Sequence, residues 1–361
     1  MERLDLLYQH ICPEVIFKSS EFTNFVQINR PPQLNAINQK IVQGITACIN
    51  ITRSSRKNFI ISGVNHKSFG AGGDLDMIIK NVAGVAEFLR GLHHIFYSIS
   101  QLPTETISLW TGYVIGSGAG VACSCNIRVA FPSSCYIMPE NHIGLFPDVG
   151  ASYFLTHYCP LDIGLYLSLT GTKLRGADCY ISGLCNYYIP AEFPIDSFLA
   201  ELERFPSPLF AIQMFHREPK SSDSMIIRQR ENIYECFSDV KSVEEVVERL
   251  KQNNSQWARE TLTAINGMCP YSLKVAFQAF MSGKDMDLCE CLEMEFNLEY
   301  HMMVHENYNF LTGARHKLKK QVNVPWMPAS LEEVTNEMVG NAFFSPRGLR
   351  LRLKELNTVF E

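Results

Sequence analysis

Residues 106–138, TISLWTGYVIGSGAGVACSCNIRVAFPSSCYIM, contain the pattern that decides the fold. Short runs rich in β-branched and aromatic residues alternate here with a Gly-rich turn and a run of small apolar residues. The pattern predicts a strand, a Gly-rich turn, a buried helix and two further strands, in this order: 106–110, 112–120, 121–125, 127–131 and 135–138.

Strands and helices alternate in the same way upstream of this stretch. The expected elements are a hairpin, a helix capped by Asn38, a third strand, a Gly-rich turn and two helical segments: 15–18 with 22–29, 38–51, 58–62, 70–73 and 74–100. Repeated strand–strand–helix units predict an α/β fold whose turns stack as a spiral, with loops at one end of the sheets forming a site. Neither a Rossmann fold nor a sandwich fits this pattern as well.

The character of the sequence changes near residue 196, after which helices dominate. Five segments have helical period and length: 223–236, 242–252, 256–266, 269–282 and 286–306. Ser242 is a suitable N-cap for the second of them. Because no low-complexity linker separates the two parts, we expect a single domain over 14–345, with an α/β spiral core at 14–190 and a helical part at 196–345.

Composition and charge argue against several classes of protein. A net charge of −5 gives no sequence-wide positive field that would gather nucleic acid. The apolar runs are too short to span a membrane. None of the twelve cysteines forms a CxxC pair, so we expect free thiols in a reducing compartment. Residues 1–7 and 357–361 carry no recognisable targeting signal.

Two Gly-rich loops could bring backbone N–H groups close to a ligand. The loop at 66–74, HKSFGAGGD, follows a strand and precedes a helix that Asp74 could cap, although a plain tight turn would look the same. The loop at 112–120 is not a Walker loop, a dinucleotide fingerprint or a hydrolase elbow around Ser117. It leads into the N-terminus of an apolar helix, where a developing negative charge is favoured.

A third loop places two acids among apolar residues and prolines. Glu140 and Asp148 lie in 138–150, MPENHIGLFPDVG, the least polar acid-bearing loop of the chain. An apolar environment raises the pKa of a carboxyl group and suits a general base or a nucleophile. The alternative is structural, with Glu140 capping a helix and Asp148 fixing a turn. Together the three loops suggest two N–H donors for an oxyanion facing a carboxylate, an arrangement suited to a thioester carbonyl.

Several motifs resemble the crotonase (enoyl-CoA hydratase/isomerase) family, and two of them resemble its 3-hydroxyisobutyryl-CoA hydrolase branch. The family-wide motifs are 29–36, 69–74 and 112–120; the branch motifs are 138–150 and the segment around 325–335. The similarity covers residues 14 to 345. It implies a crotonase-like spiral and an acyl-CoA substrate.

The resemblance also implies roles for individual residues. Ala71 and Ser117 would supply the oxyanion N–H groups, Glu140 would be the nucleophile or general base, and Asp148 would orient it or handle protons. Coenzyme A would lie along the loops at 30–36 and 66–74. The remaining substrate-binding residues implied are Gly72, Gly73, Asp74, Gly116 and Gly118.

Three positions depart from the family pattern. Gly120 stands where hydratases carry a glutamate, which argues against water addition to an enoyl-CoA. Ser117 replaces the middle glycine of a triplet, and its Cβ would be strained if the position requires a positive φ. Leu92 replaces a glutamate that the hydrolases carry near the substrate.

The sequence therefore predicts hydrolysis of a short 3-hydroxyacyl-CoA, as in valine breakdown, without metal or redox cofactor. His301 and His305, spaced i, i+4 but with no third ligand, do not indicate a metal site. The partner would be the small-molecule substrate rather than nucleic acid or membrane, and a homo-oligomer is compatible with the pattern. The family implies a mitochondrial location, with the cytoplasm as the alternative. Two other functions stay open: a non-catalytic subunit of a large assembly such as a mitochondrial ribosome, and an enoyl-CoA hydratase or isomerase.

Overall fold

The computed structural model describes residues 12–306, 308–321, 323–344 and 351–354. The chain ends on which the targeting predictions rest, 1–7 and 357–361, lie outside the described residues. The chain forms two compact units, each built from separate stretches: unit 1 comprises 1–74, 94–137 and 173–227, and unit 2 comprises 75–93, 138–172 and 228–361. Their boundaries do not coincide with the division expected near residue 190.

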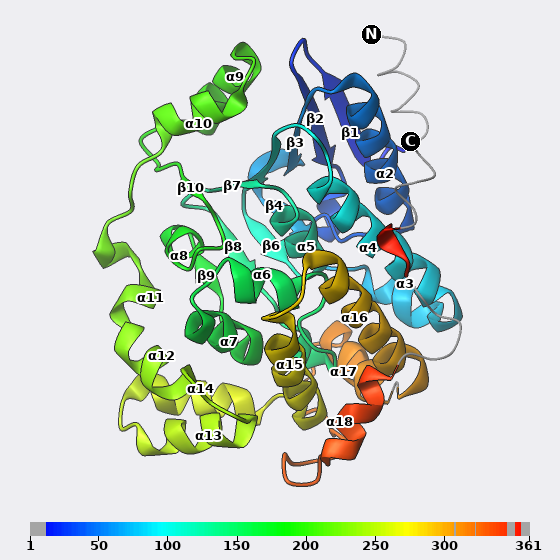
Figure 1. The fold of residues 1–361 in the computed structure, drawn as a ribbon, viewed down its shortest axis with the longest axis vertical. Helices are drawn as coiled ribbons and strands as arrows, with labels where there is room; N and C mark the ends of the chain where they lie inside the picture. The colour runs from blue at the N-terminus through cyan, green and yellow to red at the C-terminus, as the bar shows by residue number, and fades with distance from the viewer. Residues whose placement is uncertain (1–11, 307, 322, 345–350, 355–361) are drawn as a thin grey trace. The chain divides into compact units, whose positions relative to one another are not determined.

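Unit 1 contains two sheets (Figure 1). The larger has the order β1-β2-β3-β5-β7-β10, with β1 and β2 antiparallel and the other pairs parallel. Its strands are β1 Val15–Ser19, β2 Thr23–Ile28, β3 Asn58–Gly63, β5 Thr106–Trp110, β7 Ile127–Ala130 and β10 Tyr187–Tyr188. The smaller has the order β4-β6-β8-β9, with strands β4 Ser68–Ala71, β6 Tyr113–Ile115, β8 Cys135–Ile137 and β9 Leu174–Arg175.

The chain alternates between these sheets, and this alternation makes the spiral. β3, β5 and β7 of the larger sheet are followed by β4, β6 and β8 of the smaller one. Each pair of neighbouring turns is joined by parallel pairing, as between Ile107 and Ile127 or between Ala71 and Ile115. The predicted α/β spiral is confirmed.

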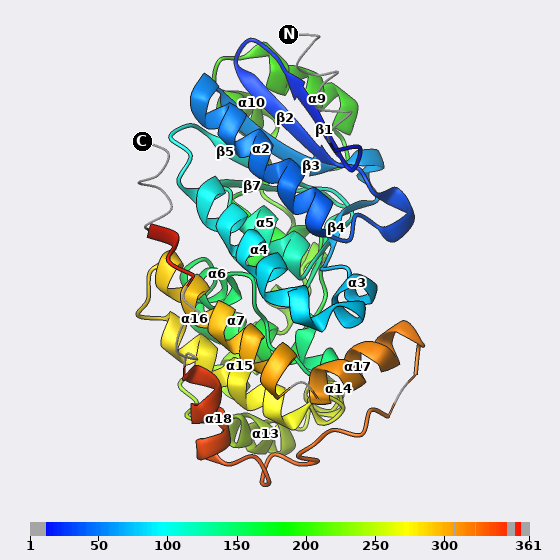
Figure 2. The ribbon, with the colours of Figure 1, turned by 90° about the vertical axis from the view of Figure 1, so that its right-hand side faces the viewer.

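Helices cover the sheets of unit 1. Helix α2, Gln39–Ser55, begins at Asn38 as predicted, because the Asn38 side chain accepts a hydrogen bond from the Ile41 N–H (3.0 Å). Figure 2 shows α2 alongside β1 to β3, which it contacts. Helices α9 Ile195–Arg204 and α10 Pro208–Phe215 pack on the larger sheet, where Phe198 and Leu202 join a core with Ile107 and Val129. The shorter helices of this unit are α5 Ser117–Cys123 and α8 Ala177–Ile181.

Unit 2 is largely helical. Helix α15 runs through it and contacts α6, α7, α13, α16 and α18; Figures 1 and 2 show α15 beside α16. The helices are α3 Leu75–Lys80, α6 Ala151–His157, α7 Leu161–Thr170, α12 Arg230–Phe237, α13 Val243–Gln252, α14 Gln256–Asn266, α15 Pro270–Gly283, α16 Leu288–Tyr300, α17 Tyr308–Leu318 and α18 Asn336–Phe343. Helices α4 Val85–Ser100 and α11 Met225–Arg228 belong partly to each unit. Ser242 caps α13, as predicted.

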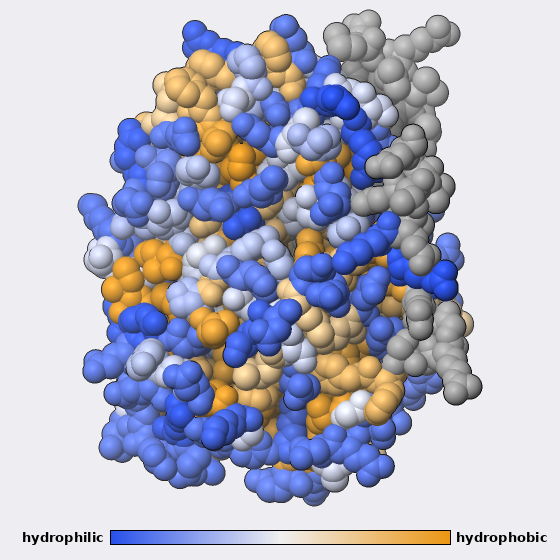
Figure 3. Space-filling model, viewed as in Figure 1, coloured by the Kyte–Doolittle hydropathy of each residue, from blue (hydrophilic) through white to orange (hydrophobic). Residues whose placement is uncertain are grey.

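The face drawn in Figure 3 is mostly hydrophilic, with scattered apolar patches. Figure 3 shows one such patch over α11, where Ile227 is exposed. No described helix is long and apolar enough to cross a membrane. All twelve cysteines are free thiols and buried, which agrees with the prediction that they pack as small apolar side chains.

Candidate active site

The two Gly-rich loops meet in unit 1 because the strands that precede them pair. β4 and β6 are parallel, with Ala71 opposite Ile115, so the residues after both strands emerge at the same edge of the sheet. Here Gly70 and Gly118 are in backbone contact. A Cβ built on Gly118 would lie 2.3 Å from the Gly70 carbonyl oxygen, and one built on Gly70 would lie 3.0 Å from the Gly118 Cα. A side chain at either position would force the loops apart.

The conformation of the second loop removes the strain expected at Ser117. The positive φ falls on Gly116 (φ 49°), whereas Ser117 is not among the residues with positive φ and is the first residue of α5. An N–H in the first turn of a helix has no acceptor within that helix and can donate to a ligand. Ser117 is 8% exposed and Ala71 is half-buried. The backbone at Ser117 therefore suits an oxyanion donor.

The loop at 30–37 is fastened to the loop at 68–74. The Asn35 amide donates to the Ser68 carbonyl oxygen (2.6 Å), and the Ile37 N–H donates to the Gly72 carbonyl oxygen (2.8 Å). Arg30 pairs with Asp74 at 2.7 Å. The predicted substrate-binding glycines lie in the loops at 66–74 and 112–120: Gly72 at φ 85°, Gly73 bridged to Ile37, Gly116 at φ 49° and Gly118 in the first turn of α5.

The two predicted acids lie in unit 2 and are both buried. Glu140 begins the 3-10 helix η4, Glu140–Ile143, and is 6% exposed, as is Asp148. Burial raises the pKa of Glu140 well above its ordinary value, and the nearby charge of Asp148 raises it further. Within the described part of the chain, Glu140 Oε2 has no hydrogen-bond partner. A buried carboxylate with an unused oxygen can accept a proton from a bound reactant.

The pKa of Asp148 is also raised well above its ordinary value. Burial is the largest cause, followed by the charge of Glu299 and a side-chain hydrogen bond with Glu299. Two neighbouring carboxyl groups cannot easily both be ionised in a buried site. The raised pKa favours the protonated form of Asp148, which can donate a proton.

Sequence reasoning missed three residues of this cluster. Glu295 and Glu299 lie one turn apart on α16 and are both 0% exposed. His93 on α4 is equally buried, and its Nε2 lies 3.0 Å from both carboxylate oxygens of Glu299. The sequence predicted only a helix at 286–306 around the two glutamates. The signal available in the sequence was a pair of acids spaced i, i+4, which lie on the apolar face of the predicted helix.

The positions that depart from the family pattern are buried as well. Leu92 is 1% exposed, so an apolar side chain fills that place. Gly120 lies in α5, whose sequence, SGAGVAC, contains no acid. The buried acids of this cluster are Glu140, Asp148, Glu295 and Glu299, all in unit 2, and α5 carries no acid.

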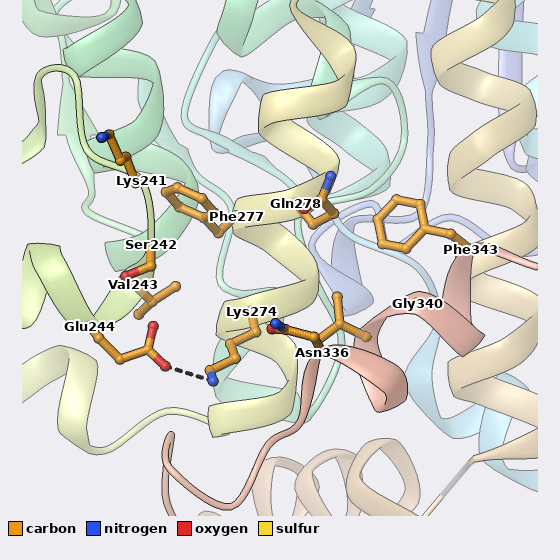
Figure 4. Close-up of a pocket in the computed structure, with 11 residues that line it drawn as sticks. Lys241, Ser242, Val243, Glu244, Lys274, Phe277, Gln278, Asn336, Gly340 and Phe343 are labelled. Carbon is orange, nitrogen blue, oxygen red and sulfur yellow. Dashed lines mark ion pairs between the residues drawn. The ribbon is translucent and has the colours of Figure 1, made fainter.

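A cavity elsewhere in unit 2 carries no comparable chemistry. It has a volume of about 460 Å³, and Figure 4 shows Phe277 and Phe343 beside it and the ion pair of Lys274 with Glu244 (2.6 Å). None of the predicted site residues lines it. The part of the chain that the structure describes also has no group of three or more His, Cys, Asp or Glu placed to hold a metal ion.

Comparison with known proteins identifies the family and several relatives of the chain. The enoyl-CoA hydratase/isomerase family model matches residues 23–344. The chain is 32% identical to the human mitochondrial 3-hydroxyisobutyryl-CoA hydrolase over 92% of this chain and 89% of the relative. It is 30% identical to the Dictyostelium discoideum protein of the same name, over 94% of each chain.

Two solved structures are similar to the chain in fold. A carnitinyl-CoA dehydratase from Mycobacterium thermoresistibile matches with a TM-score of 0.86 and 25% identity over 94% of this chain and 99% of that one. An enoyl-CoA hydratase from Rhodobacter sphaeroides matches with a TM-score of 0.83 and the same identity and coverage. By sequence and by fold, the chain belongs to the enoyl-CoA hydratase/isomerase family.

Proposed function

We propose that this protein hydrolyses a short-chain 3-hydroxyacyl-CoA thioester, with 3-hydroxyisobutyryl-CoA, an intermediate of valine breakdown, as the substrate. The observation that carries the proposal is the buried Glu140, with its raised pKa and unpaired Oε2. The names of the relatives that match nearly the whole chain support the same substrate. Water addition to an enoyl-CoA is less well supported, because α5 carries no acid.

In the proposed reaction the backbone N–H groups of Ala71 and Ser117 stabilise the negative charge on the thioester oxygen. Glu140 either attacks the carbonyl carbon or removes a proton from the water that does. A C–O bond forms, the C–S bond breaks, and Asp148 gives a proton to the departing sulfur. The products are the 3-hydroxy acid and coenzyme A, and the proton taken from water restores the acid pair.

A kinetic experiment tests the proposal. Release of the coenzyme A thiol from 3-hydroxyisobutyryl-CoA is measured for the purified protein and for Glu140→Gln, Asp148→Asn and Ser117→Pro. Each substitution should lower kcat at least about 100-fold, the usual cost of losing one such group. Glu231→Gln, at an exposed position on α12, is the matched control and should keep full activity.

Two outcomes would favour other functions. Turnover of an enoyl-CoA to a 3-hydroxyacyl-CoA, without thiol release, would indicate a hydratase. No turnover of either substrate, together with co-sedimentation with a large particle such as a mitochondrial ribosome, would indicate the non-catalytic function that Leu92 and Ser117 suggest.

For the two acid roles, a single turnover in ¹⁸O-labelled water distinguishes attack by Glu140 from attack by water. Direct attack by Glu140 forms an anhydride and releases the thiol, and water then opens the anhydride. If water attacks the Glu140 carboxyl carbon, the first product molecule carries only unlabelled oxygen, so an unlabelled first product would show attack by Glu140. We also propose a mitochondrial location, since the relatives carry that word in their names, and cell fractionation tests it.

A further inference from the structure

Helix α16 presents two buried carboxylates to the segment that follows Asp148. Glu295 accepts hydrogen bonds from the backbone N–H groups of Gly150 (2.5 Å) and Ser152 (2.8 Å) and from the Ser152 hydroxyl (2.5 Å). These donors belong to the N-cap and first turn of α6. Glu295 therefore fixes the backbone immediately after Asp148.

That backbone has an unusual conformation. Val149 has φ 57° and Gly150 has φ 92°, so two consecutive residues lie in the left-handed region. A β-branched residue rarely adopts this region, and it does so only where the surroundings enforce it. Here the Val149 N–H forms a hydrogen bond with Glu299, and the Gly150 N–H forms one with Glu295. The two glutamates thus hold the chain in the turn that directs the Asp148 side chain.

Glu299 is in addition the centre of a hydrogen-bond network. His93 Nε2 lies 3.0 Å from both of its oxygens. Burial lowers the pKa of His93 to about 4, so the ring is neutral at pH 7 and Nε2–H donates to Glu299. The Asp148 carboxyl group forms a further hydrogen bond with Glu299. Burial raises the pKa of Glu299 as well, but the hydrogen bonds with Asp148 and the Val149 backbone lower it, whereas the hydrogen bond with Glu299 raises the pKa of Asp148. These opposite effects favour Asp148 as the holder of the shared proton.

We propose that Glu299 is a positioning residue for Asp148, accepting a hydrogen bond from its protonated carboxyl group and so keeping on Asp148 the proton that the departing sulfur receives. Glu295 and His93 support this arrangement by fixing the following backbone and the Glu299 carboxylate. The use of the proton rests on the proposed function, whereas the placement of the proton on Asp148 does not. A purely structural role for the α16 glutamates, as anchors of α6, is the alternative.

Several titratable groups surround the proton shared by Asp148 and Glu299. The groups that face Asp148 and Glu299 are Glu140 from η4, Glu295 from α16 and His93 from α4. Arg90, on α4, lies with its guanidinium 5.6 Å from the centre of the Phe296 ring. Because the charges of Glu299 and Glu295 both oppose ionisation of Asp148, removal of the Glu299 charge should lower the pKa of Asp148.

The first test measures the pH profile of kcat/KM for wild type, Glu299→Gln and the control Glu293→Gln, a partly buried acid on the same helix. Glutamine keeps the shape of Glu299 but not its charge. The alkaline limb should move at least about one pH unit lower in Glu299→Gln, with KM changed less than about twofold, and should stay in place in Glu293→Gln. A folded Glu299→Gln variant with an unmoved limb would overturn the proposal.

The second test needs no catalysis. The infrared difference spectrum of wild type minus Asp148→Asn should show the carbonyl band of a protonated carboxylic acid at pH 7. In the Glu299→Gln background the band should disappear at lower pH than in wild type. If no band is present at pH 7 in wild type, the proposal is wrong, even if thioester hydrolysis is confirmed. If the band is present and no thioester is hydrolysed, only the proposed function fails.

If Glu299→Gln does not fold, His93→Phe takes its place. This variant removes the hydrogen bond that His93 donates to Glu299 and leaves the charge of Glu299. The Asp148–Glu299 pair should therefore hold its shared proton to higher pH. The infrared band should then persist about one pH unit further into the alkaline range. A band that titrates as in wild type would contradict the network.

Discussion

Gly118 lies so close to Gly70 that a Cβ on Gly118 would be 2.3 Å from the Gly70 carbonyl oxygen. The two loops proposed to hold the oxyanion are thus in direct backbone contact. We expect Gly118→Ala to separate them, to lower kcat about 100-fold and to cost about 1–3 kcal/mol of unfolding free energy. Steady-state kinetics and urea unfolding measure both. Gly340→Ala is the control, since a Cβ there meets nothing within 4 Å. Full activity in Gly118→Ala would show that the contact is dispensable.

Ser117 offers a way to remove a backbone donor at small structural cost. It is the first residue of α5, a position at which proline is favoured because its missing N–H has no partner in the helix. Ser117→Pro should therefore fold normally and lose about 100- to 1000-fold in kcat. Ser117→Ala keeps the N–H and should stay within about threefold of wild type. Circular dichroism checks the fold, and equal activities of the two variants would exclude the N–H as a donor.

The buried charge of Glu140 should oppose folding at high pH. Its pKa is raised in the folded protein, so the folded state holds the proton more tightly than the unfolded state. The contribution of Glu140 to the unfolding free energy is then greatest below its unfolded pKa of about 4.3, and it falls as the pH rises toward the folded pKa. Glu140→Gln removes this loss. Its unfolding free energy should exceed that of wild type by more at pH 8 than at pH 5 in urea titrations. A difference independent of pH would mean that the pKa is unshifted.

The same shift predicts how activity depends on acidity. Because Glu140 must lose its proton before it can act as a base or nucleophile, kcat/KM should rise with pH, with a midpoint well above the ordinary glutamate range. In the proposed roles Asp148 carries its proton while Glu140 titrates, so Asp148→Asn should reduce kcat and leave the acidic limb where it is in wild type. A limb that moves to lower pH would mean that Asp148 is ionised in the active enzyme, against the role proposed for it.

Much of the α/β unit could be predicted because its signals are local. Asn38 caps α2 through its own side chain, and strands such as β3 and β5 consist of short β-branched runs between breakers. The Gly-rich loops follow their strands as expected. Helix α7, LDIGLYLSLT, carries no such signal, because every residue from Asp162 to Thr170 is buried and no polar face gives a period. Strands β9 and β10 are two residues long, too short for any pattern.

Only part of the candidate site could be proposed from the sequence. Glu140 and Asp148 stand out because apolar residues and prolines surround them in sequence. Glu295 and Glu299 lie in CECLEMEFNLEY, where several acids alternate with apolar residues, and only tertiary packing decides which acids face inward. His93 meets Glu299 across 206 positions of sequence, a separation over which local patterns carry no information.

The burial of all twelve thiols has a practical consequence for studying this protein. Burial also raises the pKa of several of them, as for Cys125, to about 12, so few thiolates are available to an alkylating reagent. Colorimetric detection of released coenzyme A should consequently show little background from the folded enzyme. The onset of cysteine labelling on heating would then serve as a built-in reporter of unfolding, with no added dye.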